Sequence, residues 1–269
     1  MTTALATVAV GFVLGMRHAT DPDHVVAVST IVTRERTVSH AALIGILWGI
    51  GHTLMILAVG AAIILFGLAI PARLGLTMEF SVGLMLIALG LLNLTGAIRW
   101  LSEKFAPAYL GASGTHAHLH SHGGQQHSHA SAHRPESHRR GENVNAPAGL
   151  LRSLAVLGPF QILRPLCVGT VHGLAGSAAV ALLVLSTIRQ PRWAVAYLLV
   201  FGVGTIAGMM LITAAMALPF SLVGNQLAWF SRSLATASGL LSLAFGLVVS
   251  YHIGFLDGLF SGHPIWTPK

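Results

Sequence analysis

The segment Arg17–His24, which reads Arg-His-Ala-Thr-Asp-Pro-Asp-His, contains the residue types that bind a cation. Its candidate ligands are His18, Asp21, Asp23 and His24. Two of the chain's eight Asp and Glu lie here between apolar stretches, and ionisable groups at membrane depth are costly unless paired or functional. Imidazole with carboxylate suits Ni²⁺, Co²⁺ or Zn²⁺ better than Na⁺ or Ca²⁺. We therefore predict a transition-metal site. The alternative, a polar loop between two interfacial helices, fits less well because Val25–Val32 is apolar again.

Pro22 decides how these side chains can meet. On a straight helix His18 and Asp21 would share a face, whereas Asp23 would point away from them. Pro22 lacks the backbone N–H that would bond the His18 carbonyl, and its ring clashes with that carbonyl. We predict a broken helix, which lets the ligands converge and frees backbone carbonyls.

Two further histidines lie inside apolar runs, in Gly51-His52-Thr53 and in Gly169-Thr-Val-His172-Gly. Either one alone could simply bond to a neighbouring helix. Their small neighbours allow helices to approach closely, so we predict that both complete the metal site. Oxygen ligands, or groups that orient the imidazoles, are then expected from Thr53, Thr170 and Ser177.

A third group of histidines alternates with other residues in the middle of the chain. The predicted metal-binding positions of this tract are His116, His118, His120, His122, His127 and His129. Such His-rich tracts are typical of metal binding. The alternative is a flexible low-complexity linker.

The elements that must hold these groups are membrane helices. Hydrophobic residues make up 54% of the chain and charged residues 9%, whereas soluble domains carry about 25% charged residues. The longest apolar runs are Ala41–Ile70, Phe80–Ile98, Leu166–Ile188, Trp193–Leu218 and Leu234–Ile253, and we add Thr3–Val32 as one interrupted segment. Each meets or approaches the roughly 20 residues that cross a bilayer. None alternates with period two, as strands of a membrane barrel do.

The two halves resemble each other. Gly15-Met-Arg-His18 corresponds to Gly169-Thr-Val-His172, and Gly49-Ile-Gly51 corresponds to Gly202-Val-Gly204, at nearly equal offsets. We therefore predict an all-α integral membrane protein of about six transmembrane helices, built as two inverted three-helix repeats. The expected divisions are residues 1–100 (first repeat), 101–163 (cytoplasmic His-rich loop, largely disordered), 164–256 (second repeat) and 257–269 (tail).

Lys and Arg are distributed unevenly between the two sides of this topology. One side holds Arg34, Arg36, Arg99, Lys104, Arg134, Arg139, Arg140, Arg152, Arg164 and Arg232. The other holds Arg73, Arg189, Arg192 and Lys269. Cytoplasmic loops are enriched in positive residues, so the first side is predicted to be cytoplasmic in a multi-pass protein of a bacterial inner membrane.

These motifs resemble the nickel/cobalt transporter family (NiCoT, or NicO). Its Arg-His-Ala-X-Asp-Ala-Asp-His motif corresponds to Arg17–His24, and its Gly-His-Ser/Thr motif to Gly51-His52-Thr53. This chain departs from the family at His172, which stands where the family has Asp, and after Gly208–Leu211, where the expected Asp is missing. The departures are similar to the urease-accessory-like permease branch. The resemblance implies transport of nickel or cobalt.

We therefore expect a secondary permease for divalent Ni²⁺ or Co²⁺, with uptake slightly favoured over efflux and no permanently bound cofactor. Its expected partners are the lipid bilayer, the metal ion and a cytoplasmic metallochaperone, but not nucleic acid. A metal-handling accessory protein for a nickel enzyme such as urease is the alternative. An intramembrane zinc enzyme using His18, Asp23, His24 and His172 is disfavoured, because there is no His-Glu-X-X-His motif and we expect no Glu at membrane depth.

Overall fold

The computed structural model describes residues 2–33, 37–66, 70–97, 117–122, 125–130, 159–174, 190–223 and 228–266. Its α-helices are α1 (Thr2–His18), α2 (Pro22–Val32), α3 (Val38–Phe66), α4 (Ala72–Leu94), α7 (Pro159–Gly173), α9 (Pro191–Val223) and α10 (Ala228–Tyr251). A single π-helical turn, η3 (His252–Leu256), extends α10. Strands β1 (Ala117–His122) and β2 (Gln125–Ala130) form an antiparallel hairpin.

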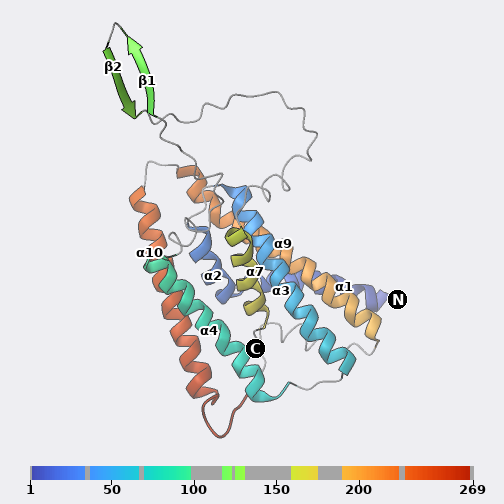
Figure 1. Cartoon of the computed structure of the whole chain (residues 1–269). Helices are drawn as coiled ribbons and strands as arrows, with labels where there is room; N and C mark the ends of the chain where they lie inside the picture. Colours follow the sequence, from blue (N-terminus) through green and yellow to red (C-terminus); the bar gives the residue numbers. More distant parts are fainter. Residues whose placement is uncertain are drawn as a thin grey trace.

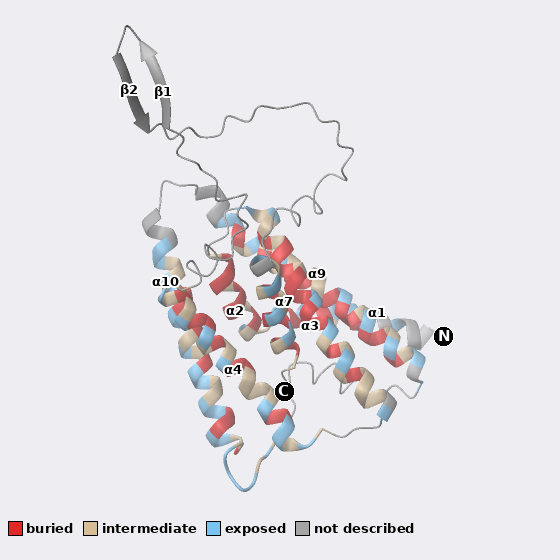
Figure 2. Ribbon diagram, viewed as in Figure 1, coloured by how far each residue is buried: buried red, intermediate tan, exposed pale blue. Residues whose placement is uncertain are grey.

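Among the residues that the structure describes, four helices are long and apolar enough to cross a membrane, namely α3, α4, α9 and α10. Large hydrophobic side chains lie exposed along them, for example Leu54, Leu84, Val203 and Leu247. In Figure 2, exposed and buried residues alternate along these helices, and buried residues gather where the helices lie against one another. Such an apolar exterior suits lipid rather than water.

The helices pack in two groups. In the first, α3 lies against α9, α1 packs on α9, and α7 packs on α3; in the second, α4 pairs with α10 (Figure 1). The contacts of α3 with α9 run in opposite directions along the chain, since Gly49 faces Ile206 and Gly202 faces Thr53. This pair is therefore antiparallel.

The flanking helices approach the central pair through glycine. A Cβ on Gly15 of α1 would collide with the Phe201 carbonyl oxygen of α9, and a Cβ on Gly169 of α7 would collide with the Trp48 carbonyl oxygen of α3. In each of these pairs, residues later in one helix contact residues later in the other. Helix α1 is therefore parallel to α9, and α7 is parallel to α3. Glycine is required here because any side chain would push the backbones apart.

The short helix α2 lies inside the molecule, with contacts to α4, α9 and α10. Its buried apolar residues are Val26, Ala27, Val28, Ile31 and Val32. A helix that is apolar nearly all round is held by protein on all sides rather than by a single face. This burial fixes the start of α2, where Asp23 and His24 lie.

The chain after α10 folds back onto the start of α4. Trp266 packs over Gly75 and donates its indole N–H to Glu79 Oε1 at 2.8 Å. Glu79 lies two turns into α4, a candidate span, so the expectation that no Glu lies at membrane depth overlooked it. The contact ties the C-terminal segment to the end of α4 that follows α3.

Several expectations can now be compared with the structure. The protein is helical, but the hairpin of β1 and β2 is an exception to the all-α prediction. The hairpin lies within the central loop predicted for residues 101–163, and residues 159–163 of that loop begin α7; its remaining residues lie outside the described ranges. The predicted apolar segment Leu166–Ile188 is described only as far as Leu174, while α7 begins earlier, at Pro159. Four helices meet the length of a span, and the number of six stays a prediction.

Candidate metal centre

The break between α1 and α2 creates the site. Helix α1 ends at His18 in a tight turn, where Thr20 N–H donates to the Arg17 carbonyl at 2.8 Å. Helix α2 restarts with Pro22 at its first position, where the missing N–H removes no hydrogen bond. The segment is thus interrupted where the sequence predicts. The interruption brings the end of one helix and the start of the next to one point.

His18 lies between Asp21 and His52. Its Nδ1 donates to Asp21 Oδ2 at 2.8 Å, and its Nε2 lies 3.0 Å from His52 Nε2 on α3. Asp21 adopts an extended conformation and makes no capping bond to α2, so its carboxylate serves His18 instead. The effect is to fix the orientation of the His18 ring.

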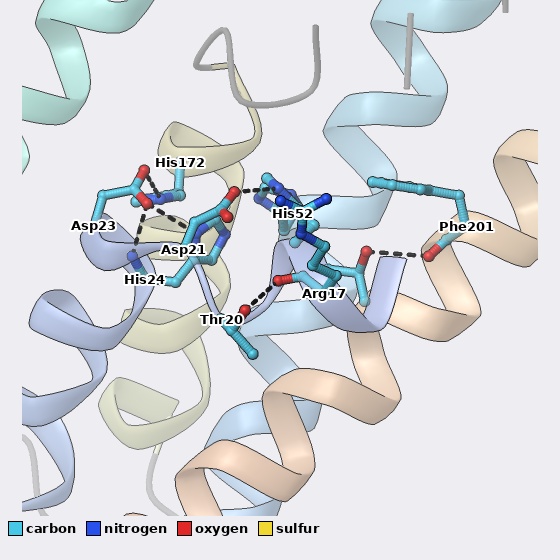
Figure 3. A network of polar contacts seen from close by, with 10 residues as sticks. Arg17, Thr20, Asp21, Asp23, His24, His52, His172 and Phe201 are labelled. Carbon is cyan, nitrogen blue, oxygen red and sulfur yellow. Dashed lines mark hydrogen bonds and ion pairs between the residues drawn. The ribbon is translucent and has the colours of Figure 1, made fainter. Parts of the chain in front are cut away.

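Asp23 lies between two other histidines (Figure 3). Its Oδ2 accepts a hydrogen bond from His172 Nε2 at 2.9 Å, and its Oδ1 lies 3.2 Å from His24 Nδ1. The same Oδ1 accepts the backbone N–H of His24 at 3.0 Å. Asp23 also lies in the first turn of α2, where the helix dipole stabilises negative charge. These contacts favour a negatively charged Asp23 carboxylate beside two of the imidazoles.

The four imidazoles form one cluster. His24 is central, with ring centroids 4.6 Å from His18, 4.1 Å from His172 and 5.2 Å from His52. Four helices, α1, α2, α3 and α7, each contribute to it. All four histidines are buried, whereas the side chains of Asp21 and Asp23 are 40% and 21% exposed. The carboxylates therefore form the more accessible side of the cluster.

Three buried ring nitrogens in the cluster lack partners. In the neutral state, His24 Nδ1 and His172 Nε2 carry the protons bonded to Asp23, and His52 Nε2–H donates to His18. The remaining lone pairs, on His24 Nε2, His52 Nδ1 and His172 Nδ1, find no donor within the described ranges. A buried acceptor without a partner costs free energy, about 1–3 kcal/mol each. A bound cation would satisfy such atoms.

Within the described part of the chain, two sets of residues have the spacing to hold a metal ion. One comprises His18, His24 and His52, and the other comprises Asp23, His24 and His172; within each set the ligand atoms lie within 4.8 Å of one another. Nitrogen with a single carboxylate is the donor set of a borderline divalent metal.

Two aromatic residues that the sequence analysis did not single out enclose the cluster. Trp48 lies with its ring centroid 5.9 Å from His172 and 6.5 Å from His24, and Phe201 lies 5.7 Å from His18. Both are buried. Trp48 stands one helical turn before His52, a spacing that could have indicated a shared face. The two rings exclude water from the imidazoles and limit their rotation.

The other predicted positions lie elsewhere. The Thr53 hydroxyl donates to the Gly202 carbonyl at 3.3 Å, and the exposed Thr170 hydroxyl donates to the Leu166 carbonyl at 2.9 Å. Neither bonds an imidazole. Ser177 and His116 lie outside the described residues. The remaining loop histidines occupy the hairpin, where His118 pairs with His129 and His120 with His127 in the backbone register.

The chain is similar to one curated protein, the urease accessory protein UreH of Bacillus sp. (strain TB-90). The two are 33% identical over 256 residues, which cover 95% of each chain. No family model and no solved structure matches the chain. At this identity and coverage, the chain belongs to the UreH family of urease accessory proteins.

Proposed function

We propose that this protein carries a divalent transition-metal ion, Ni²⁺ or Co²⁺, across the bacterial cytoplasmic membrane as a secondary permease, with uptake favoured. The observation that carries the proposal is the buried cluster at the α1–α2 break. Four imidazoles and one carboxylate converge there, and three of their nitrogens lack a partner among the described residues. A structural role would not need so many ligand atoms at one point.

The packing supports a transporter built from two inverted repeats. In the proposed repeats, α1, α3 and α4 correspond to α7, α9 and α10. Exchanging the halves then turns the contact of α1 with α9 into the contact of α7 with α3, and it leaves the contacts of α3 with α9 and of α4 with α10 unchanged. Helices α1 and α7 run antiparallel, as inverted copies must. His18 contacts Phe201 as His172 contacts Trp48, so the cluster lies between the proposed repeats. Transporters of this kind bind substrate at such an interface.

A second function is favoured by the relative's name. UreH is called a urease accessory protein, and the sequence analysis named a nickel enzyme such as urease as the alternative recipient of the metal. On this alternative, the chain binds the metal and delivers it to a cytoplasmic partner, such as a metallochaperone, without translocating it. The two functions share the metal centre and differ in whether the ion crosses the membrane.

Flux into vesicles distinguishes these functions. The full chain, reconstituted in proteoliposomes, should accumulate ⁶³Ni²⁺, whereas His18→Ala, Asp23→Ala and His24→Ala should each reduce accumulation to the level of empty vesicles. The control is His252→Ala, which removes a histidine that is 46% exposed and paired with Asp257, far along the chain from the cluster. Normal flux in all three cluster variants would reject the assignment. Binding without flux in the wild type would favour the accessory role.

A further inference from the structure

We infer that the metal centre has two overlapping positions for one ion, both using His24. The His52 position is formed by His18, His24 and His52, and the Asp23 position by Asp23, His24 and His172. This inference rests on the proposed metal-binding function and goes beyond it, because it assigns two coordination states to the ion.

The His52 position already has the spacing of a loaded site. Two nitrogens bound at right angles to one metal at about 2.1 Å lie about 3.0 Å apart. His18 Nε2 and His52 Nε2 are 3.0 Å apart. An ion that takes the place of the shared proton therefore requires little movement of either ring, and that proton moves to His52 Nδ1, so the ring stays neutral. Asp21, bonded to the far nitrogen of His18, raises the basicity of that ligand.

The Asp23 position shares only His24 with the His52 position. Asp23 Oδ2 and His172 Nε2 are 2.9 Å apart, again the separation of two adjacent ligands. The ring centroids of His24 and His172 are only 4.1 Å apart, whereas those of His52 and His172 are 6.0 Å apart. His172 is thus grouped with Asp23 and His24 rather than with the imidazoles of the His52 position.

Because both positions use His24, only one ion can be bound at a time. Filling both positions would bind two doubly charged ions to the same imidazole, in surroundings that screen charge poorly. It would also require His24 to give up its single N–H proton and bind as an anion. The ion therefore occupies one set of ligands at a time, and filling either set excludes the other.

Full-length protein in detergent, loaded with Ni²⁺ alone, provides the test. X-ray absorption at the nickel edge counts imidazoles per metal, and equilibrium binding gives stoichiometry and affinity. The wild type should bind one Ni²⁺ per chain. His52→Ala should leave the Asp23 position, with two imidazoles and a carboxylate; His172→Ala should leave the His52 position, with three imidazoles. Since the two positions are alternatives, the variant that keeps the tighter position should lose no more than about twofold in affinity, the other variant at least as much, and His24→Ala more than either.

Three outcomes would overturn the inference: two Ni²⁺ per chain at saturation, four imidazoles around one Ni²⁺ in the wild type, or equal losses of affinity in all three variants. Asp23→Asn, nearly the same shape as the wild type, replaces His172→Ala if that variant does not fold, and should also give three imidazoles. His252→Ala is the control and should match the wild type. Absence of ⁶³Ni²⁺ flux with the expected spectra would refute transport and leave the two positions standing.

Discussion

At the scale of single residues, the carboxylates of Asp21 and Asp23 make different contacts. Asp23 touches two histidines of the cluster and belongs to one of the ligand sets, whereas Asp21 touches His18 alone. The sequence analysis predicted Asp21 as a metal ligand from its spacing. Its hydrogen bond to His18 fits a different role, in which Asp21 orients the His18 imidazole. A carboxylate behind a ligating histidine typically contributes about 10–100-fold to metal affinity.

Asp21→Asn should therefore weaken Ni²⁺ binding without abolishing it. The amide keeps the shape of the carboxylate but not its charge, so the His18 ring stays in place and becomes a poorer ligand. We expect a loss of about 10-fold in affinity, clearly less than for His18→Ala. Asp257→Asn, which alters another aspartate paired with a histidine, is the control. Equal losses in Asp21→Asn and His18→Ala would show that Asp21 binds the metal directly.

Some of the site follows from sequence and some does not. Pro22 lacks a hydrogen-bond donor, so the break beside His18 could be predicted from residue type alone. The hydroxyls of Thr53 and Thr170 were expected near the metal but donate to backbone carbonyls, since threonine in a helix readily does so. Trp48 was overlooked because an aromatic residue in an apolar run usually only packs against neighbouring helices.

At the scale of helices, the close approach of α1 and α7 to the central pair sets the position of the histidines. His18 follows Gly15 by three residues, and His172 follows Gly169 by three. Any outward shift of these helices moves the imidazole with the backbone. Helix directions and contacts of this kind depend on three-dimensional packing. The sequence could indicate the repeat through shared Gly and His positions, but it could not show which helices touch.

Gly15→Ala and Gly169→Ala should each destabilise the protein and weaken Ni²⁺ binding. The added methyl group meets a backbone carbonyl, which cannot rotate away, so the helix itself must shift. We expect a loss of about 1–3 kcal/mol in the free energy of unfolding, measured by denaturation in detergent. Gly262→Ala is the matched control, because a Cβ there meets nothing within 4 Å. Wild-type stability and binding in both variants would contradict the close approach.

At the scale of the whole molecule, the His-rich loop stands apart from the metal centre in sequence and composition. Its histidines alternate with small and polar residues, and it supplies none of the described ligands of the cluster. Deleting residues 115–138 should therefore leave residual Ni²⁺ transport and change its dependence on metal concentration. The measurement is ⁶³Ni²⁺ flux at several concentrations, with the variant's membrane level as control. Complete loss of flux at normal levels would give the loop an essential role.

The orientation of the chain can be predicted from the packing together with the charges. Trp266 and Glu79 hold the C-terminal segment beside the start of α4, and the His-rich loop follows the other end of the same helix. If α4 spans the membrane, these two regions must lie on opposite faces. Most Lys and Arg lie on the side of the loop, so the loop should be cytoplasmic and the C-terminal segment external.

Single cysteines test this orientation. The native Cys167 is replaced by serine, and a cysteine is placed either at Gly262, where a side chain meets no neighbour, or at Ser128 in the loop. A membrane-impermeant maleimide should label Gly262→Cys in intact cells, but Ser128→Cys only after permeabilisation. The reversed pattern would place the loop outside, where it could not pass metal to a cytoplasmic partner. Equal labelling of both positions in intact cells would show that α4 does not separate them, and the six-span topology would have to be abandoned.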